Sequence, residues 1–99
     1  MEPDDPELRR VFLEEARRRV REMATALRGR AGRDKLWRHA HSLTGAASSV
    51  GEEGVERLAR DIAEAVRDET GRPRAWTREA RVRVERDVAG IEDELGRLH

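Results

Sequence analysis

One histidine with glycines at fixed distances carries the chemistry that this sequence offers. His41 lies in the segment LWRHAHSLTGAASSVG, residues 36–51, and is followed four residues later by Gly45 and ten residues later by Gly51. A neutral imidazole is a titratable nucleophile. A glycine inside a helix costs about 1 kcal/mol relative to alanine. Either that cost is incidental at Gly45, or a large partner has to approach the backbone beside His41.

The spacing of apolar residues predicts that this segment forms a helix with its histidine facing outward. At about 100° per residue, five apolar side chains fall on one stripe. They are Leu36, Ala40, Leu43, Ala47 and Val50. His41 lies about 140° from the centre of this stripe, on the side of Trp37, Thr44 and Ser48. We therefore expect His41 to project from the middle of the helix, partly exposed.

The rest of the chain predicts three further amphipathic helices and no strand. Apolar residues recur every three or four positions in each segment, and no stretch alternates convincingly with a period of two. The glycine-containing segments 28–34 (RGRAGRD) and 70–74 (TGRPR) predict loops, and Gly51 predicts the end of the second helix. The expected helices cover residues 6–27, 35–50, 52–69 and 76–98. Their expected N-terminal caps are Asp4 and Asp5 ahead of Pro6, then Asp34, and finally Thr77.

Four helices with short connections predict an all-α fold, an up-and-down antiparallel four-helix bundle. The 99 residues leave room for one modest core, so we expect a single domain over residues 1–99 and no separate catalytic domain. Charged residues make up 42% of the chain and hydrophobic residues 36%. This balance is typical of amphipathic helices around a thin aliphatic core with solvated outer faces.

Composition also excludes several classes of function. The formal net charge is +0 and no basic block stands out, so nucleic-acid binding is not expected. There is no cysteine, which excludes disulfides and thiolate metal sites. His39 and His41 diverge by about 200° on a helix, so no metal site is expected from them either. No apolar run approaches the roughly 18–20 residues of a membrane span, and a cytoplasmic protein that contacts no membrane is the expectation.

The segment around the histidine resembles a known family. The run AHSLTGAASSVG, residues 40–51, is similar to the signature of histidine-containing phosphotransfer (HPt) domains, in which A-H-x-L-K-G is followed by small residues and a second glycine. The segment FLEEARRRVREMATAL, residues 12–27, resembles the opening helix of the CheA-type members. Together with the helix after Gly51, the resemblance covers most of the chain. HPt domains are built around a four-helix bundle, which agrees with the helical pattern.

The resemblance implies a phosphorelay module. His41 would accept a phosphoryl group and exchange it with the aspartate of a receiver domain. The implied partners are a response-regulator receiver domain, a histidine kinase, or both. No cofactor is expected on this chain, and Mg²⁺ is expected on the receiver. The chain ends in Leu98-His99 without a linker-like tail, which favours a free-standing protein over the first domain of a larger kinase.

Three positions depart from the family pattern and keep a second interpretation open. The usual lysine three residues after the histidine is Thr44, which offers a hydroxyl and no charge. The polar residue expected twenty-two positions after the histidine is Ala63, and the second histidine of CheA-type members is Arg60. Arg60, Arg38 or Arg57 is a candidate for the missing positive charge. The alternative is therefore an HPt-like helical interaction module that binds a receiver or kinase without being phosphorylated.

The expected phosphorylation site is His41. The residues expected to form its phosphoryl environment and docking surface are Trp37, Arg38, Thr44, Gly45, Ser48, Arg60 and Glu64.

Overall fold

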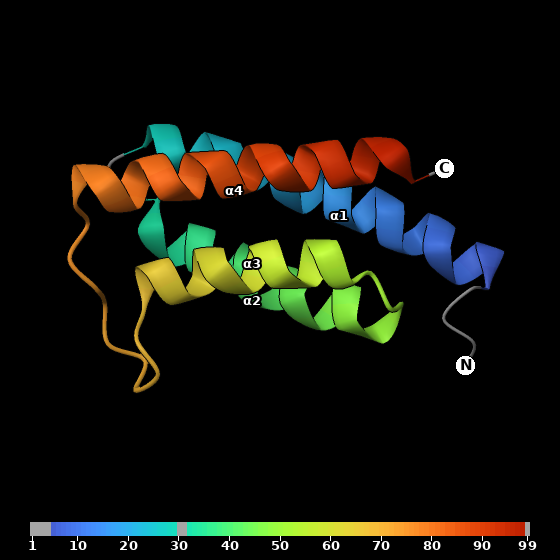
Figure 1. Ribbon diagram of the computed structural model, residues 1–99, viewed down its shortest axis with the longest axis horizontal. Helices are drawn as coiled ribbons and strands as arrows, with labels where there is room; N and C mark the ends of the chain where they lie inside the picture. The colour runs from blue at the N-terminus through green and yellow to red at the C-terminus, as the bar shows by residue number, and fades with distance from the viewer. Residues whose placement is uncertain (1–4, 30–31, 99) are drawn as a thin grey trace.

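Four helices that run alternately in opposite directions form the structure, a computed structural model that describes residues 5–29 and 32–98 (Figure 1). Each helix packs on the next one along the chain, and the last packs back on the first, so that all four surround one core. This arrangement confirms the predicted all-α, antiparallel four-helix bundle. The helices are α1 (Pro6–Arg28), α2 (Arg33–Ser49), α3 (Glu53–Val66) and α4 (Arg78–Arg97).

The buried side chains of the described residues are all apolar. On α2, Leu36, Ala40, Leu43 and Ala47 are each at most 1% exposed, and Val50 directly after the helix is 4% exposed. The predicted apolar stripe is therefore the buried face of α2. Within the described residues no polar side chain belongs to the buried set, and no helix is both long and apolar enough to cross a membrane. The other helices contribute Phe12, Leu13, Ala16, Val20, Met23, Ala26, Val55, Ala59, Ile62, Val66, Val84, Val88, Ile91 and Leu95.

α2 begins two residues earlier than predicted, because a close backbone approach sets its start. A Cβ atom on Gly32 would lie 2.0 Å from the carbonyl oxygen of Ala26, so only glycine fits where the chain turns back against α1. The helix then starts at Arg33 without a side-chain cap. The prediction that Asp34 caps this helix is wrong, since Asp34 lies inside the first turn. The predicted loop over residues 28–34 loses Arg33 and Asp34 to α2 and Arg28 to α1.

α3 ends three residues earlier than predicted, at Val66 instead of Glu69. The reason is a turn organised by Asp68, whose Oδ1 accepts hydrogen bonds from the backbone N–H (2.9 Å) and the hydroxyl (2.6 Å) of Thr70. The backbone N–H of Arg72 donates to the same oxygen at 3.0 Å. Such side-chain bonds to nearby backbone groups compete with continuation of a helix.

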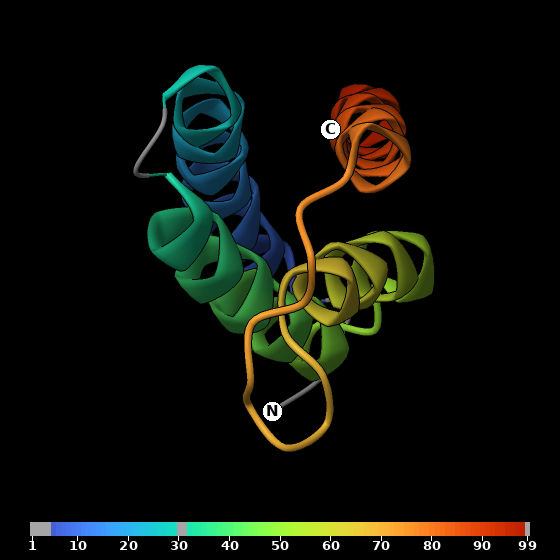
Figure 2. The ribbon, with the colours of Figure 1, turned by 90° about the vertical axis from the view of Figure 1, so that its left-hand side faces the viewer.

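The connection from α3 to α4, residues 67–77, is a hairpin; we call it the α3–α4 hairpin. Arg67 and Pro73 form an isolated backbone bridge, and Gly71 has a φ of 84°, which favours glycine. Figure 2 shows this hairpin reaching out past α2 and α3 before it returns to α4. It ends at Thr77, whose hydroxyl oxygen accepts a backbone N–H of the first turn of α4 at 3.1 Å. The predicted cap is confirmed, and α4 starts two residues later than the predicted start.

Two further predicted helix ends are confirmed. Asp5 caps α1 by accepting the backbone N–H of Glu7 at 2.9 Å, and Pro6 is the first helical residue. Asp4, the other predicted cap, lies outside the described residues. Gly51 follows α2 with a φ of 74°, a conformation that ends a helix at little cost only for glycine.

Two valines on α4 provide a matched test of this core. Val84 is 0% exposed, whereas Val82 is 45% exposed. We predict that Val84→Ala lowers the free energy of unfolding by about 2 kcal/mol, through lost burial and a cavity. The control Val82→Ala should leave that free energy unchanged or raise it slightly, because alanine is the better helix former. Urea unfolding of both variants measures the difference, and equal losses would contradict the assigned core face of α4.

Candidate functional site

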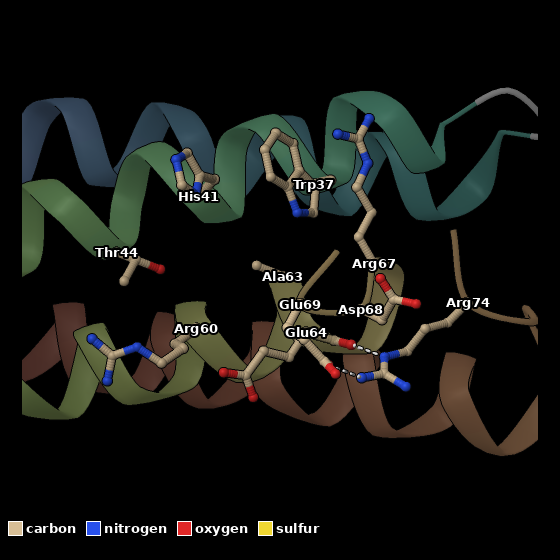
Figure 3. A pocket seen from close by; sticks show the side chains of 10 residues that line it. All are labelled: Trp37, His41, Thr44, Arg60, Ala63, Glu64, Arg67, Asp68, Glu69 and Arg74. Atoms are coloured by element: carbon tan, nitrogen blue, oxygen red, sulfur yellow. Dashed lines mark hydrogen bonds and ion pairs between the residues drawn. The ribbon is translucent and has the colours of Figure 1, made fainter. Parts of the chain in front are cut away.

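A groove of about 500 Å³ runs between α2, α3 and the α3–α4 hairpin (Figure 3). Three of its lining residues come from α2, three from α3 and four from the hairpin. Most of them carry polar or charged groups, so the groove suits a charged group better than an apolar one. The lining residues are Trp37, His41, Thr44, Arg60, Ala63, Glu64, Arg67, Asp68, Glu69 and Arg74.

His41 is exposed and stands on the outer face of α2. Its position follows from the helical period, because Ala40 and Leu43 on either side of it are 0% exposed and fix the opposite face in the core. Among the described residues, no hydrogen bond joins a protein group to either ring nitrogen. The methyl group of Ala63, across the groove on α3, cannot provide one. Both nitrogens of His41 are therefore open to a group that approaches from outside.

The imidazole of His41 is instead held by an aromatic neighbour one turn earlier. Trp37 stacks on it with ring centroids 4.7 Å apart and an interplanar angle of 10°. The guanidinium carbon of Arg67 lies 4.1 Å from the centroid of the Trp37 ring. Figure 3 shows Trp37 between His41 and Arg67. An aromatic pair contributes about 0.5–1.5 kcal/mol beyond its burial, and a cation–π contact about 0.5–1 kcal/mol at an exposed site.

The three arginines of the groove are each matched to an acidic or carbonyl oxygen. Arg60 Nη2 lies 2.5 Å from Glu56 Oε2 on the same helix, and Arg67 Nη2 lies 3.2 Å from Asp34 Oδ1 at the start of α2. Arg74 donates from Nε to the backbone carbonyl of Glu64 at 2.6 Å, which ties the hairpin to α3. The pair of Arg60 with Glu56 is of the exposed kind that is weak, so an incoming anion with more charge can take over Arg60.

Thr44 lies one turn after His41 on α2 and lines the groove with it. Its hydroxyl donates to the backbone carbonyl of Ala40 at 2.8 Å. The hydroxyl proton is therefore engaged within the helix, and Thr44 supplies no positive charge. Arg60 lies across the groove on α3, on the side of Thr44 (Figure 3), and its side chain is 52% exposed. The positive charge that lines the groove is carried by Arg60 on α3 and by Arg67 and Arg74 on the α3–α4 hairpin.

Comparison with known families agrees with this geometry. The sequence matches the Hpt domain over residues 7–99, a span that includes all but the first residue of α1 and the whole of the other three helices. The chain belongs to the Hpt domain family. Hpt domains carry out histidine phosphotransfer in phosphorelays, which confirms the resemblance drawn from the signature. The finer resemblance to CheA-type members stays a prediction. Comparisons with curated proteins and with solved structures gave no match.

The groove of this Hpt domain brings together only part of the predicted site. Trp37, Thr44, Arg60 and Glu64 line it together with His41. The other three predicted residues, Arg38, Gly45 and Ser48, are exposed on α2 outside the groove. A Cβ atom on Gly45 would meet no atom within 4 Å, so the surface beside it is open.

Sequence reasoning missed the hairpin side of the groove. Arg67, Asp68, Glu69 and Arg74 line the groove, but the first three were predicted to continue α3. The available signal was an aspartate followed closely by threonine and glycine, which is typical of a side-chain-capped turn. Reading that signal would have ended α3 at Val66. Across residues 5–29 and 32–98, no group of three or more histidine or acidic side chains is placed to hold a metal ion.

The hydrogen bonds to the Asp68 carboxylate make the stability of the fold depend on pH in acidic buffer. The hydroxyl of Thr70 and then the backbone N–H of Arg72 stabilise its carboxylate, and they hold its pKa below the ordinary value of 3.8. A carboxylate with a lowered pKa stabilises the fold above its unfolded-state pKa, and this contribution is lost as the pH falls through the folded-state pKa. Asp68→Asn removes the titrating group. We expect the variant to be less stable than wild type above about pH 4, with the difference shrinking in more acidic buffer.

Urea unfolding of both proteins over a series of acidic buffers measures that difference, and all other carboxylates are common to the pair. A stability difference that stays constant as the pH falls would contradict the assigned role of Asp68.

Proposed function

We propose that this protein is a phosphocarrier of a two-component phosphorelay, in which His41 accepts a phosphoryl group and exchanges it with the aspartate of a receiver domain. The observation that carries the proposal is the exposed imidazole on the outer face of α2, in the groove of a chain that belongs to the Hpt domain family. The partners are a response-regulator receiver domain, a histidine kinase, or both. We propose the chain as a single domain over residues 1–99.

The proposed transfer needs only one nucleophile from this chain. A ring nitrogen of His41 attacks the phosphorus atom of an aspartyl phosphate, a nitrogen–phosphorus bond forms, and the aspartate leaves as a carboxylate. The reverse step returns the phosphoryl group. The partner receiver supplies Mg²⁺ for the charge that develops on the phosphoryl oxygens, and phosphoryl transfer depends mainly on positioning and charge stabilisation. This chain therefore has to offer access, orientation and a docking surface.

Arg60 is the proposed source of positive charge on this chain. It lines the groove with His41, whereas the two other candidates, Arg38 and Arg57, lie outside it. Its present partner, Glu56, is a neighbour on the same helix in an exposed pair of low energy. A phosphoryl group on His41 carries more negative charge than that carboxylate, so Arg60 gains by turning toward it.

The remaining predicted residues divide between the proposed phosphoryl environment inside the groove and the proposed docking surface beyond it. Glu64 and Trp37 stand on opposite sides of the groove, while Arg38, Gly45 and Ser48 extend the exposed face of α2 beyond it. A partner that reaches His41 has to cover this face. The open space at Gly45 is where its backbone can come closest.

A second candidate function is supported by the His41 ring, which has no hydrogen-bond partner among the residues that the structure describes. Ala63 cannot orient the imidazole and Thr44 carries no charge, which favours an interaction module that binds a receiver or kinase and is not phosphorylated. The two candidates differ in one measurable property. A phosphocarrier becomes labelled, whereas an interaction module binds the receiver equally well with or without the histidine.

We predict that His41→Gln abolishes labelling by a phosphorylated receiver or a cognate kinase, because glutamine has no nucleophilic ring nitrogen. The wild-type label should be labile in acid and stable in base. His39→Gln is the matched control, two residues away on α2. His39 accepts a hydrogen bond from Arg19 on α1 at 3.1 Å, and burial with the nearby Arg19 charge lowers its pKa. A label that survives His41→Gln contradicts the site, and unlabelled binding that His41→Gln leaves unchanged supports the second candidate.

We predict that Gly45→Ala stabilises the protein and slows phosphoryl transfer. Alanine in place of an exposed helical glycine raises the free energy of unfolding by about 0.5–1 kcal/mol. The added methyl group stands where the partner approaches, so the rate of transfer should fall several-fold. Gly96→Ala on α4 is the matched control, because its Cβ would also meet no atom within 4 Å. The control should show the gain in stability without the loss of transfer, and equal transfer rates for both variants would contradict the close approach at Gly45.

A further inference from the structure

We infer that Trp37, held in place by Arg67, is the residue that positions the imidazole ring of His41. The stack of the two rings orients the imidazole in place of a polar side chain at position 63, where this protein has Ala63. The inference rests on the proposed function for its kinetic consequence alone. Its geometric content, that the stack fixes the ring plane of His41, stands independently of phosphorylation.

The first step is the geometry of the stack. The rings of Trp37 and His41 are 10° from parallel with centroids 4.7 Å apart. Rotation of the imidazole about its Cβ–Cγ bond would tilt it out of this parallel arrangement and lose the contact. Both ring nitrogens point outward within the ring plane, so a fixed plane fixes the directions in which either nitrogen can attack. Only a half-turn, which restores the same plane, remains free.

The second step is that Trp37 is itself held in place. The guanidinium carbon of Arg67 lies 4.1 Å from the Trp37 ring centroid, and Figure 3 shows Arg67 and His41 on either side of the indole. Arg67 is in turn paired with Asp34, one turn before Trp37 on α2. Its backbone leaves α3 in an extended conformation and bridges to Pro73. The first turn of α2 and the hairpin therefore converge on one indole ring.

The third step separates positioning from packing. Trp37 is half-buried and also packs against the core, so its removal affects stability whatever its role at the site. Arg67 lies outside the core cluster; its guanidinium stacks on the tryptophan ring and forms an ion pair with Asp34. A purely structural Trp37 would make His41 indifferent to the charge on Arg67. A positioning Trp37 makes His41 respond to it.

The experiment compares four variants of the whole protein. Trp37→Leu removes the ring, Trp37→Phe keeps a flat ring, and Arg67→Met keeps an apolar stem and removes the charge. Arg57→Met is the matched control, because Arg57 is exposed on the same helix as the groove arginine Arg60 and does not line the groove.

The first readout is the proton NMR spectrum of the His41 ring, which needs no partner. Protons stacked on an indole are shifted upfield, so the ring protons of His41 should lie upfield of those of His39 in wild type. Trp37→Leu should abolish this shift, Arg67→Met should reduce it, and Arg57→Met should leave it unchanged. Trp37→Phe should keep part of it.

The second readout is single-turnover transfer from a phosphorylated receiver over a range of receiver concentrations. We expect Trp37→Leu and Arg67→Met to lower the limiting rate several-fold and to leave the half-saturating concentration unchanged. Trp37→Phe should restore most of the rate. A change confined to the half-saturating concentration assigns Trp37 to docking and overturns the inference.

The outcomes keep the inference and the proposed function apart. If wild-type His41 takes no label, the proposed function fails, while the ring shifts still decide whether Trp37 and Arg67 hold the imidazole. If Arg67→Met leaves both the shift and the limiting rate at wild-type values, the inference is overturned even when His41 is labelled normally. If Trp37→Leu does not fold, as circular dichroism would reveal, Arg67→Met and Trp37→Phe decide the question on their own.

Discussion

The buried face of α2 is the constraint on which the rest of this structure depends. Ala40, Leu43 and Ala47 are completely buried, and a helix of 3.6 residues per turn then has no freedom in where its other side chains point. His41 faces outward because its neighbours face inward. The core against which α2 packs contains no buried polar residue in the described chain, so it offers the imidazole no interior site. The exposure of His41 is a consequence of this packing, and no further interaction is needed to explain it.

The second constraint is the length of α3. Because Asp68 ends that helix early, the chain turns out and back, and the α3–α4 hairpin forms one wall of the groove. A helix that continued to Glu69 would keep Arg67 in helical conformation. The extended backbone at Arg67 instead allows its guanidinium to reach both Trp37 and Asp34. One carboxylate in a turn thus determines what surrounds an imidazole on another helix.

These two constraints explain which features were predictable from sequence. The buried stripe, the four helices and the outward histidine follow from local periodicity, which each segment carries by itself. The cap at Thr77 follows from local chemistry in the same way. The start of α2 could not be predicted from local pattern. It depends on the distance between Gly32 and the backbone of Ala26, which is a tertiary contact. Only part of the stack on His41 could be predicted from the sequence. The spacing between Trp37 and His41 is visible there, whereas the approach of Arg67 depends on the hairpin.

The stack also changes what kind of control the protein exerts over its histidine. A hydrogen bond to one ring nitrogen fixes the tautomer and removes that nitrogen from chemistry. Stacking fixes the plane, and in the part of the chain that the structure describes neither nitrogen of His41 is hydrogen-bonded to a protein group. A phosphocarrier has to accept a phosphoryl group and give it back. The ring nitrogen is the nucleophile in the first reaction and the leaving group in the second. An imidazole that is held by stacking can serve both reactions in one orientation, because no protein contact has to break at the reacting nitrogen. In the proposed function, two of the three groove arginines, Arg60 on α3 and Arg67 behind the indole, provide charge beside the ring and leave its edge to the partner.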